Sequence, residues 1–347
     1  DYDQAKEGGG LRGLIAFAFE GDTTAADALF GEFIAALESI PAEGPTFRDW
    51  LQTHTDNDNV IRLFQGFCAA LMGTNLHEIP AGEFFRFLKY SSRGSRFGMA
   101  PRGNGELMAA LAAEIEARGG TIRTQTRCQR ILCDGDRVTG VELTSREHDA
   151  EIVTCNYVLS NTGPDRTVEL AGGRDQFDAE YLKLLDKAPI EAPIFHISFI
   201  TDEPLIEGFD GCLVFGNNEN LIYLEIPSLI SPAVSPPGKY LHTAFGAPTD
   251  AATADLAAEL ENTLKELHAN FPGKLDNAQI LVKARHSGQS PGMHRWAGHM
   301  LPVTTSFDNL FNVGDGATSP GTIGTEGAAS SARDAVNQIL SQPMPHN

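Results

Sequence analysis

The sequence has little positive charge and lacks a long apolar run. Its 26 lysines and arginines face 46 aspartates and glutamates, which leaves a formal net charge of −20. Such an acidic surface would repel a phosphate backbone, so we expect no nucleic acid partner. No stretch of about 18 consecutive apolar residues occurs, so we expect no membrane-spanning helix. The acidic segment that begins at Asp1 also differs from the basic start of a signal peptide.

Cysteines are few, odd in number and scattered. Cys68, Cys128, Cys133, Cys155 and Cys212 include no C-x-x-C pair, which argues against a metal site. We therefore expect reduced thiols and a cytoplasmic protein. The sequence also shows no internal repeat and no Ser-His-Asp arrangement, and its 41% hydrophobic and 21% charged residues are typical of a globular protein.

One stretch near the start matches the G-x-G-x-x-G pattern of dinucleotide-binding turns, through Gly8, Gly10 and Gly13. Such a turn follows a buried strand, but residues 1–7 read DYDQAKE, which is too polar for a central strand. A second strand should follow about 20 residues later, yet residues 22–40 space their apolar side chains as a helix does. We therefore interpret residues 1–21 as a flexible lead-in and not as a nucleotide site.

Residues 22–100 have mostly helical patterns. Thr46 is a candidate N-cap, with Asp49 in the first turn that follows. An apolar stripe runs along residues 59–73. The segment from Ile79 to Tyr90 is rich in phenylalanine, and such a helix forms either core or the lining for an apolar ligand.

The middle of the chain alternates between helix and strand. We predict a helix over residues 105–118 that Gly119-Gly120 ends. Two strands joined by a turn at Asp134-Gly135-Asp136 follow it. Further predictions are one apolar strand over residues 151–161, several strands between residues 190 and 246, and one amphipathic helix over residues 255–271.

The most informative stretch is NLFNVGDGATSPGTIGTEGAASSARDAVNQIL, residues 309–340. An apolar strand, Leu310 to Val313, leads into Gly314-Asp315-Gly316, and a glycine-rich loop then leads to a helix that starts near Thr325. The N–H groups at a helix start can meet a phosphate, and a carboxylate at a strand end can accept hydrogen bonds from ribose or ribityl hydroxyls. On chemistry alone, a glycine-rich loop with a solvated aspartate explains the pattern equally well.

Together these pieces resemble the phytoene desaturase-like and carotenoid isomerase-like branch of the FAD-dependent amine oxidase superfamily. The resemblance extends from Ala42 to Leu340. The segments that carry it are PTFRDWLQTHTDN with IPAGEFFRFL, APRGNGELMAALAAEIEARGGTI, RCQRILCDGDRVTGVEL with VLSNTGP, and LFNVGDGATSPGTIGTEGAASSARDAV.

The resemblance implies an α/β fold in which a Rossmann-like FAD/NAD(P)-binding domain is intertwined with an α+β substrate domain of mixed sheet and helices. It implies FAD as cofactor, with Asp315 bonded to the ribityl chain and the loop and helix start near the pyrophosphate and flavin ring. Contacts near the adenine ribose fall at Arg127 and Cys128. The implied FAD-binding residues are Arg127, Cys128, Gly314, Asp315, Gly316, Gly321, Thr322 and Ile323.

The sequence departs from the family pattern in two ways. Asn104 stands where relatives have the second glycine of a turn. The N-terminal βαβ unit, which carries the true G-x-G-x-x-G and precedes a region like residues 22–38, is not found, so the Rossmann-like domain is expected to be incomplete at its N-terminus. We therefore expect this chain alone to bind FAD weakly or not at all, and either the sequence is a fragment or a second chain supplies the missing half.

The expected division is a lead-in (1–21), a helical part of the substrate domain (22–100), an FAD-domain segment (101–165), the substrate-domain sheet and helices (166–299) and a C-terminal FAD-domain segment (300–347). The expected function is an FAD-dependent oxidoreductase, of desaturase, dehydrogenase or isomerase type, that acts on an apolar, isoprenoid-like small molecule and contacts membranes at most peripherally. The alternative is a non-catalytic fragment or subunit. No catalytic residue is assigned: His294, Arg295, Trp296, His299 and Met300 precede the last motif, and Arg102 is a further candidate, but packing explains each of them as well.

Overall fold

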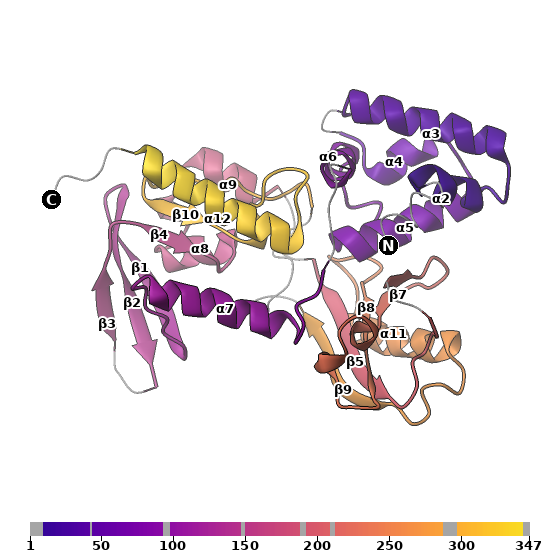
Figure 1. Ribbon diagram of the computed structural model, residues 1–347. Helices are drawn as coiled ribbons and strands as arrows, with labels where there is room; N and C mark the ends of the chain where they lie inside the picture. The colour runs from indigo at the N-terminus through magenta and orange to yellow at the C-terminus, as the bar shows by residue number, and fades with distance from the viewer. Residues whose placement is uncertain are drawn as a thin grey trace. The chain divides into compact units, whose positions relative to one another are not determined.

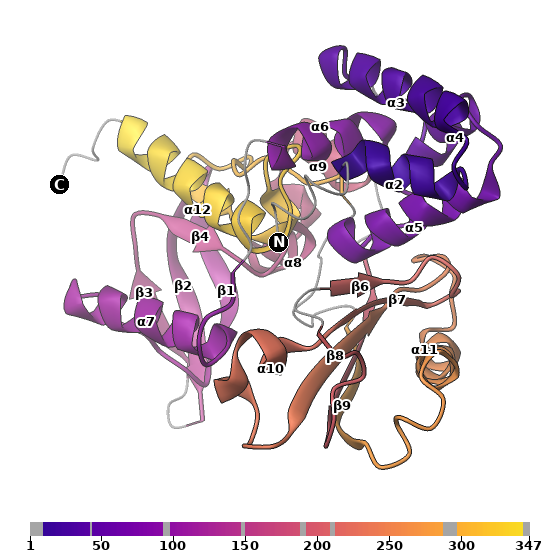
Figure 2. The same cartoon turned by 45° about the vertical axis from the view of Figure 1, so that its right-hand side comes forward.

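The computed structural model describes residues 10–41, 44–92, 98–146, 150–187, 192–208, 212–286 and 297–342. The chain forms two compact units. The first unit comprises Asp1–Ala113 and Ala192–Ser290, and the second comprises Glu114–Glu191 and Pro291–Asn347. Each unit is therefore built from two separate stretches of sequence, as Figures 1 and 2 show by colour.

The N-terminal stretch of the first unit is helical, as the sequence predicts. Its helices are α2 (Gly10–Ala18), α3 (Thr23–Glu38), α4 (Phe47–Gln52), α5 (Asp58–Met72) and α6 (Ala81–Ser91). Thr46 caps α4 in a reciprocal arrangement: the Thr46 hydroxyl accepts from the N–H of Asp49, whose side chain accepts from the N–H of Thr46. Gly73 ends α5 in the left-handed conformation, at φ 59°.

Phenylalanines fill the centre of this helical layer. The Phe47 and Phe84 rings stack with centroids 3.7 Å apart, and the Phe33 ring packs edge-on against both. All three side chains, with Phe64 and Phe85, are at most 1% exposed. Phe84 and Phe85 of the aromatic segment 79–90 therefore belong to the core, whereas Phe87 and Leu88 are half-buried.

The flexible lead-in predicted for residues 1–21 is wrong for residues 10–18. These residues form α2, because Ile15 and Ala18 lie on one face of the helix and are buried, and α2 packs against α3 and α5. Gly10 and Gly13 lie inside this helix, where a dinucleotide fingerprint would require a loop after a strand. Gly8 lies outside the described residues.

The second stretch of the first unit is a five-stranded antiparallel sheet in the order β6-β7-β8-β5-β9. Phe195, Ile197 and Ala244 on one face form a core with Leu260 and Leu267 of the helix that covers this face, α11. The elements are β5 (Ile194–Thr201), β6 (Cys212–Val214), β7 (Leu221–Glu225), α10 (Pro227–Ile230), a 3-10 turn η2 (Pro232–Val234), β8 (Tyr240–Gly246), α11 (Leu256–Asn270) and β9 (Gln279–His286).

The second unit contains two small sheets. β1 (Thr126–Asp134), β2 (Arg137–Ser145) and β3 (Glu151–Thr154) form an antiparallel meander, and β4 (Val158–Ser160) pairs in parallel with β10 (Leu310–Asn312). The single strand predicted for residues 151–161 is therefore wrong. The last contact with the meander is at Cys155, whose N–H donates to Thr139 O. Pairing with the β10 segment begins at Val158, whose N–H donates to Asn309 O.

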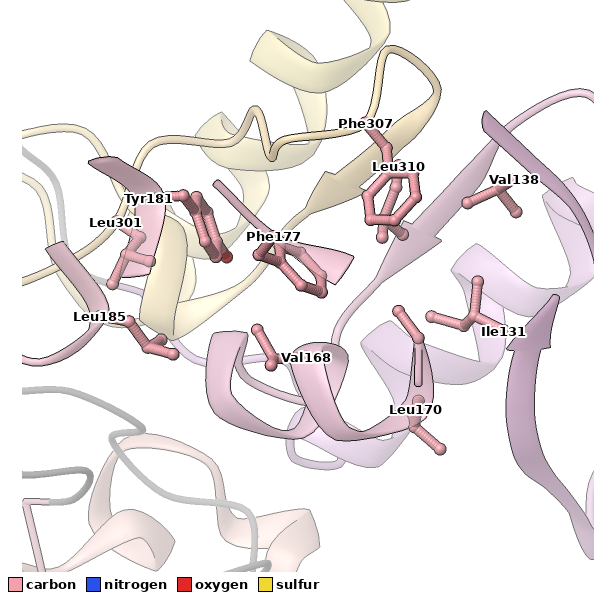
Figure 3. Close-up of a cluster of buried hydrophobic side chains, with 11 residues drawn as sticks. Ile131, Val138, Val168, Leu170, Phe177, Tyr181, Leu185, Leu301, Phe307 and Leu310 are labelled. Atoms are coloured by element: carbon pink, nitrogen blue, oxygen red, sulfur yellow. The ribbon is translucent and has the colours of Figure 1, made fainter. Parts of the chain in front are cut away.

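One hydrophobic core holds the second unit together (Figure 3). It joins Ile131 and Val138 of the meander to Leu310 of β10 and to the short helices α8 (Pro164–Leu170) and α9 (Ala179–Leu185). A 3-10 turn, η1 (Arg174–Gln176), lies between these helices. Residues 166–187 thus belong to the unit that contains β10, because Val168, Tyr181 and Leu185 are buried in this core. The sequence instead predicts that they group with the sheet that is found in the first unit.

The helix predicted over residues 105–118 is α7 (Asn104–Ala117), and none of its side chains is buried. The remaining elements of the second unit are a 3-10 turn, η3 (Asp315–Ala317), and the C-terminal helix α12 (Gly324–Ser341). Among the described residues, no helix combines the length and apolarity that crossing a membrane requires. All five cysteines are free, as expected.

Candidate functional site

The candidate site begins where the two parallel strands of the second unit end. β4 and β10 run side by side, and the N–H of Val313 donates to Ser160 O at 2.9 Å, just beyond the paired residues. Each strand is followed by a turn and a helix: β4 leads to α8, and β10 leads to α12. Ligands of open α/β sheets bind beyond the carboxyl ends of such strands.

Gly314 is the first residue of the loop after β10, and its backbone permits no side chain. Its φ of 91° is in the left-handed region, and a Cβ atom built there would overlap Oδ1 of Asn161 from the turn after β4. The N–H of Gly314 donates to the Ser331 hydroxyl of α12 at 2.7 Å. The two strand ends and α12 therefore meet at one backbone position.

Internal hydrogen bonds fix the loop from residue 315 to residue 323. The Thr318 hydroxyl donates to Thr322 O at 3.1 Å, and the Thr322 hydroxyl donates to Ser319 O at 2.6 Å. A Cβ atom on Gly327 would come within 2.7 Å of the Thr318 side chain, so α12 packs closely against this loop. Thr318 and Thr322 are 4% and 6% exposed, which makes the loop a rigid and largely buried backbone segment.

The N-terminus of α12 has no side-chain cap. Ile323 occupies the N-cap position and has no hydrogen-bonding side chain, and Gly324 follows with φ 57°. The first N–H groups of a helix have no partner within the helix, and they carry the positive end of its dipole. An 18-residue helix that starts in this way offers a binding site for a phosphate or another anion.

The predicted residues from Gly314 to Ile323 all lie in this strand–loop–helix segment. Asp315 is half-buried in η3, and Gly316, Gly321 and Thr322 are buried. Arg127 and Cys128 lie elsewhere, on β1, which pairs with β2 and packs against α8. Arg127 is exposed, and burial raises the pKa of the half-buried Cys128 thiol.

The other candidates from the sequence differ in where they lie. His294, Arg295 and Trp296 lie outside the described residues; His299 and Met300 are half-buried and directly precede Leu301, whose N–H donates to Gly316 O at 3.0 Å. Arg102 precedes α7, is exposed and forms an ion pair with Glu106 in the first turn of this helix.

One polar residue that belongs to no recognised motif role, Asn309, links the site to the core. Asn309 is 1% exposed; its side chain accepts from the Val138 N–H at 2.8 Å and donates to Val138 O and to Asn156 O, both at 2.7 Å. These bonds tie the start of β10 to the meander and to the segment before β4. No single-sequence signal distinguishes this asparagine, because its partners are more than 150 positions away.

Comparison with known proteins gives the following similarities. A model of the flavin containing amine oxidoreductase family matches residues 11–340. A crystal structure of an oxidoreductase from Methanosarcina mazei superposes with a TM-score of 0.83 at 23% identity, and the match covers 93% of this chain and 74% of that chain. A structure of a Pyrococcus furiosus protein superposes with a TM-score of 0.70 at 19% identity, covering 92% of this chain and 72% of that one. No curated protein matches the chain. The structural similarities show a shared fold.

Proposed function

The chain belongs to the flavin-containing amine oxidoreductase family, and from this membership we propose that it is an FAD-dependent oxidoreductase whose cofactor binds at the carboxyl ends of β4 and β10. The uncapped N-terminus of α12, which follows directly on the loop after β10, is the observation that carries the proposal. A dinucleotide cofactor brings a pyrophosphate, and the positive end of a helix dipole is suited to bind it.

The residues at these strand ends fit FAD. Gly314, Gly316 and Gly321 are buried and leave the loop without side chains at these positions, and Asp315 supplies a half-buried carboxylate. In the proposed arrangement Asp315 accepts a hydrogen bond from a ribityl hydroxyl, and Thr322 and Ile323 lie beside the flavin. Arg127 and Cys128 are proposed near the adenine ribose. Bound FAD would supply a two-electron acceptor for a carbon–carbon or carbon–nitrogen bond, or a redox-neutral aid to isomerisation.

We further propose an apolar, isoprenoid- or carotenoid-like substrate, and a reaction of desaturase, dehydrogenase or isomerase type. The resemblance of the motifs to phytoene desaturase-like and carotenoid isomerase-like proteins supports this choice. An apolar substrate of this kind partitions into lipid, so we propose a cytoplasmic enzyme that contacts a membrane peripherally.

FAD titration of two matched variants tests the cofactor site. Thr325 is exposed in the first turn of α12. A carboxylate at this position interacts favourably with the helix dipole but repels a pyrophosphate. We expect Thr325→Glu to bind FAD about tenfold more weakly than the wild type, with a melting temperature that is not lowered. The control, Asn337→Glu, places the same charge near the other end of α12 and should leave FAD affinity unchanged. Equal FAD affinity in both variants would contradict a pyrophosphate at this helix end.

A second candidate is a non-catalytic subunit that needs a partner chain to complete the FAD site. Parallel sheets occur almost only when both faces are covered. In the described residues the parallel sheet has two strands, and Leu159 of β4 is 40% exposed, whereas its neighbour Phe311 on β10 is 2% exposed. We propose that a further strand, followed by a helix, pairs with β4 and covers Leu159.

The two candidates give different results in the same titration. The enzyme proposal expects weak but saturable FAD binding by the chain and, for a desaturase or dehydrogenase, bleaching of the flavin absorbance when the substrate is added. Absence of FAD binding at any concentration, together with binding after co-expression with a βαβ segment taken from a relative, would support the subunit instead. Substrate-independent binding of one FAD per chain would contradict the need for a partner.

A further inference from the structure

One face of the C-terminal helix α12 is attached to the loop that follows β10. Gly327, Ser331 and Asp334 follow one another at intervals of four and three residues, so they lie on the same face of this helix. Gly327 lies close to the side chain of Thr318, and the Asp334 carboxylate accepts the Ser319 hydroxyl at 3.1 Å. Ser331 lies between these two contacts and makes a third.

The Ser331 hydroxyl both donates and accepts a hydrogen bond. Its proton is donated to Ala328 O, one turn earlier in α12, at 2.7 Å, and its oxygen accepts the N–H of Gly314, also at 2.7 Å. Ser331 is 0% exposed, and Gly314 is buried as well. Removal of the hydroxyl would therefore leave a buried backbone N–H without its partner, which is costly.

Gly314 directly precedes the turn that carries Asp315. The carbonyl oxygen of Gly314 accepts the N–H of Ala317 at 3.1 Å, which closes η3 around Asp315. Because the N–H of Gly314 is bound to Ser331, the turn and α12 are joined next to Asp315. A shift of Gly314 relative to α12 would move Asp315 with it.

The proposed FAD site needs two groups at a fixed separation. One is the Asp315 carboxylate, which is proposed to accept a ribityl hydroxyl, and the other is the N-terminus of α12, which is proposed to bind the pyrophosphate. FAD binds most tightly when both groups are already held in place. Where they are not, binding has to order the turn against the helix, and this ordering lowers the affinity.

We propose that Ser331 is a positioning residue for FAD, which fixes the Asp315 carboxylate relative to the N-terminus of α12 so that one cofactor molecule binds to both. Ser331 does not itself contact the cofactor in this arrangement; it acts through the backbone of Gly314. The inference rests on the proposed FAD site and adds to it the residue that pre-organises the site.

A comparison of two ligands tests this role. FAD contacts both groups, whereas ADP carries the pyrophosphate but no ribityl chain, so ADP uses the helix start without Asp315. We expect Ser331→Ala to bind FAD about tenfold more weakly than the wild type and ADP less than about twofold more weakly. Binding is measured by calorimetry on the full chain, together with the βαβ segment of a relative where the chain alone does not reach saturation. Equal weakening of both ligands would show that Ser331 only supports the fold, and would overturn the proposal.

Two further variants locate the effect. Ser330 is buried one position earlier on α12, and its hydroxyl accepts from Arg333 of the same helix at 3.4 Å; Ser330→Ala should leave the affinities for FAD and ADP unchanged. On an Asp315→Ala background, Ser331→Ala should change FAD affinity by less than about twofold, because the group that it positions is gone. An undiminished tenfold effect on that background would contradict positioning through Asp315. Should Ser331→Ala fail to fold, Ser331→Cys, whose sulfur is a weak acceptor, should give the same difference between FAD and ADP.

Amide exchange tests the hydrogen bond without any flavin. With selective ¹⁵N-glycine labelling, the Gly314 amide should exchange at least about tenfold faster in Ser331→Ala than in the wild type. The Gly327 amide, which donates to Ile323 O at 3.1 Å, is the internal reference and should keep its rate. Unchanged exchange at Gly314 would overturn the role of Ser331.

The failure of this proposal can be told from the failure of the cofactor site. A wild type that binds no FAD, even with the βαβ segment, would overturn the FAD site and with it the positioning role. FAD binding of equal strength by the wild type and Ser331→Ala would overturn the role of Ser331 and leave the cofactor site untouched.

Discussion

His242 should make the first unit lose stability in mild acid. The side chain is fully buried on β8. Its Nε2 accepts the N–H of Leu205 at 3.1 Å, its Nδ1 lies 3.0 Å from Tyr240 O, and its ring stacks on Phe199 with centroids 4.9 Å apart. These contacts require the neutral ring with the proton on Nδ1.

The pKa of His242 gives the sign and size of the effect. Burial lowers this pKa from 6.5 to about 4, although the Tyr240 carbonyl acts in the opposite direction. Between these values the unfolded chain binds a proton that the folded chain does not, so the free energy of unfolding falls as the pH drops from 6.5 towards 4. The loss attributable to this side chain is about 2 kcal/mol at about pH 5 and reaches about 3 kcal/mol at lower pH.

Urea unfolding, followed by circular dichroism at about pH 7.5 and about pH 5, measures the effect. His242→Gln can still accept from Leu205 but cannot be protonated, so its unfolding free energy should fall by about 2 kcal/mol less than that of the wild type over this interval. His268→Gln, an exposed change near the end of α11, is the control and should keep the wild-type pH dependence. An equal fall in wild type and His242→Gln would refute the reasoning.

Three further predictions concern the second unit. In a protein with a complete FAD site, Asp315→Ala should weaken FAD binding about thirtyfold, by about 2 kcal/mol, through the lost ribityl bond; unchanged FAD affinity with an apoprotein that melts several degrees lower would make Asp315 structural. Gly314→Ala should lower the unfolding free energy by about 2 kcal/mol or more, because its φ is 91° and its Cβ would overlap Asn161, whereas Gly324→Ala, at φ 57° with open space around its Cβ, should cost only about 1 kcal/mol; equal losses by denaturant titration would contradict the overlap. Asn309→Ala should cost about 3 kcal/mol, because it leaves the Val138 backbone without its partners, and a loss below about 1 kcal/mol would show that water replaces the side chain.

Local signals in the sequence predicted several elements of both units. Thr46, the predicted N-cap, caps α4, and Gly119, which is predicted to end the helix over residues 105–118, follows α7 with φ 85°. Each signal works over a few residues, because capping side chains bond to N–H groups two or three positions ahead. The same local character made the segment from Gly314 to Ile323 recognisable as a candidate site.

The errors of sequence analysis share one physical cause. The sequence predicts a flexible segment at residues 10–18, because glycines favour flexibility and Ile15 and Ala18 are buried only by contact with neighbouring helices. Strand β9 was not predicted, and its register with β5 runs from His286 opposite Ile194 to Gln279 opposite Ile200. Packing partners and strand neighbours that lie far apart in sequence leave no local signal in either segment.

The sequence by itself determined the types of most elements, the acidic and cysteine-poor character of the chain, and the strand–loop–helix segment after Leu310, because these depend on neighbouring residues. Only the tertiary structure decided that residues 151–161 divide between two sheets, that β4 and β10 bring Asn161 against Gly314, and that Tyr223, Phe245, His196 and His286 stack in one row. Each of these depends on strand pairing between distant segments, and a shift of one residue in register would turn the same side chains to the other face of the sheet.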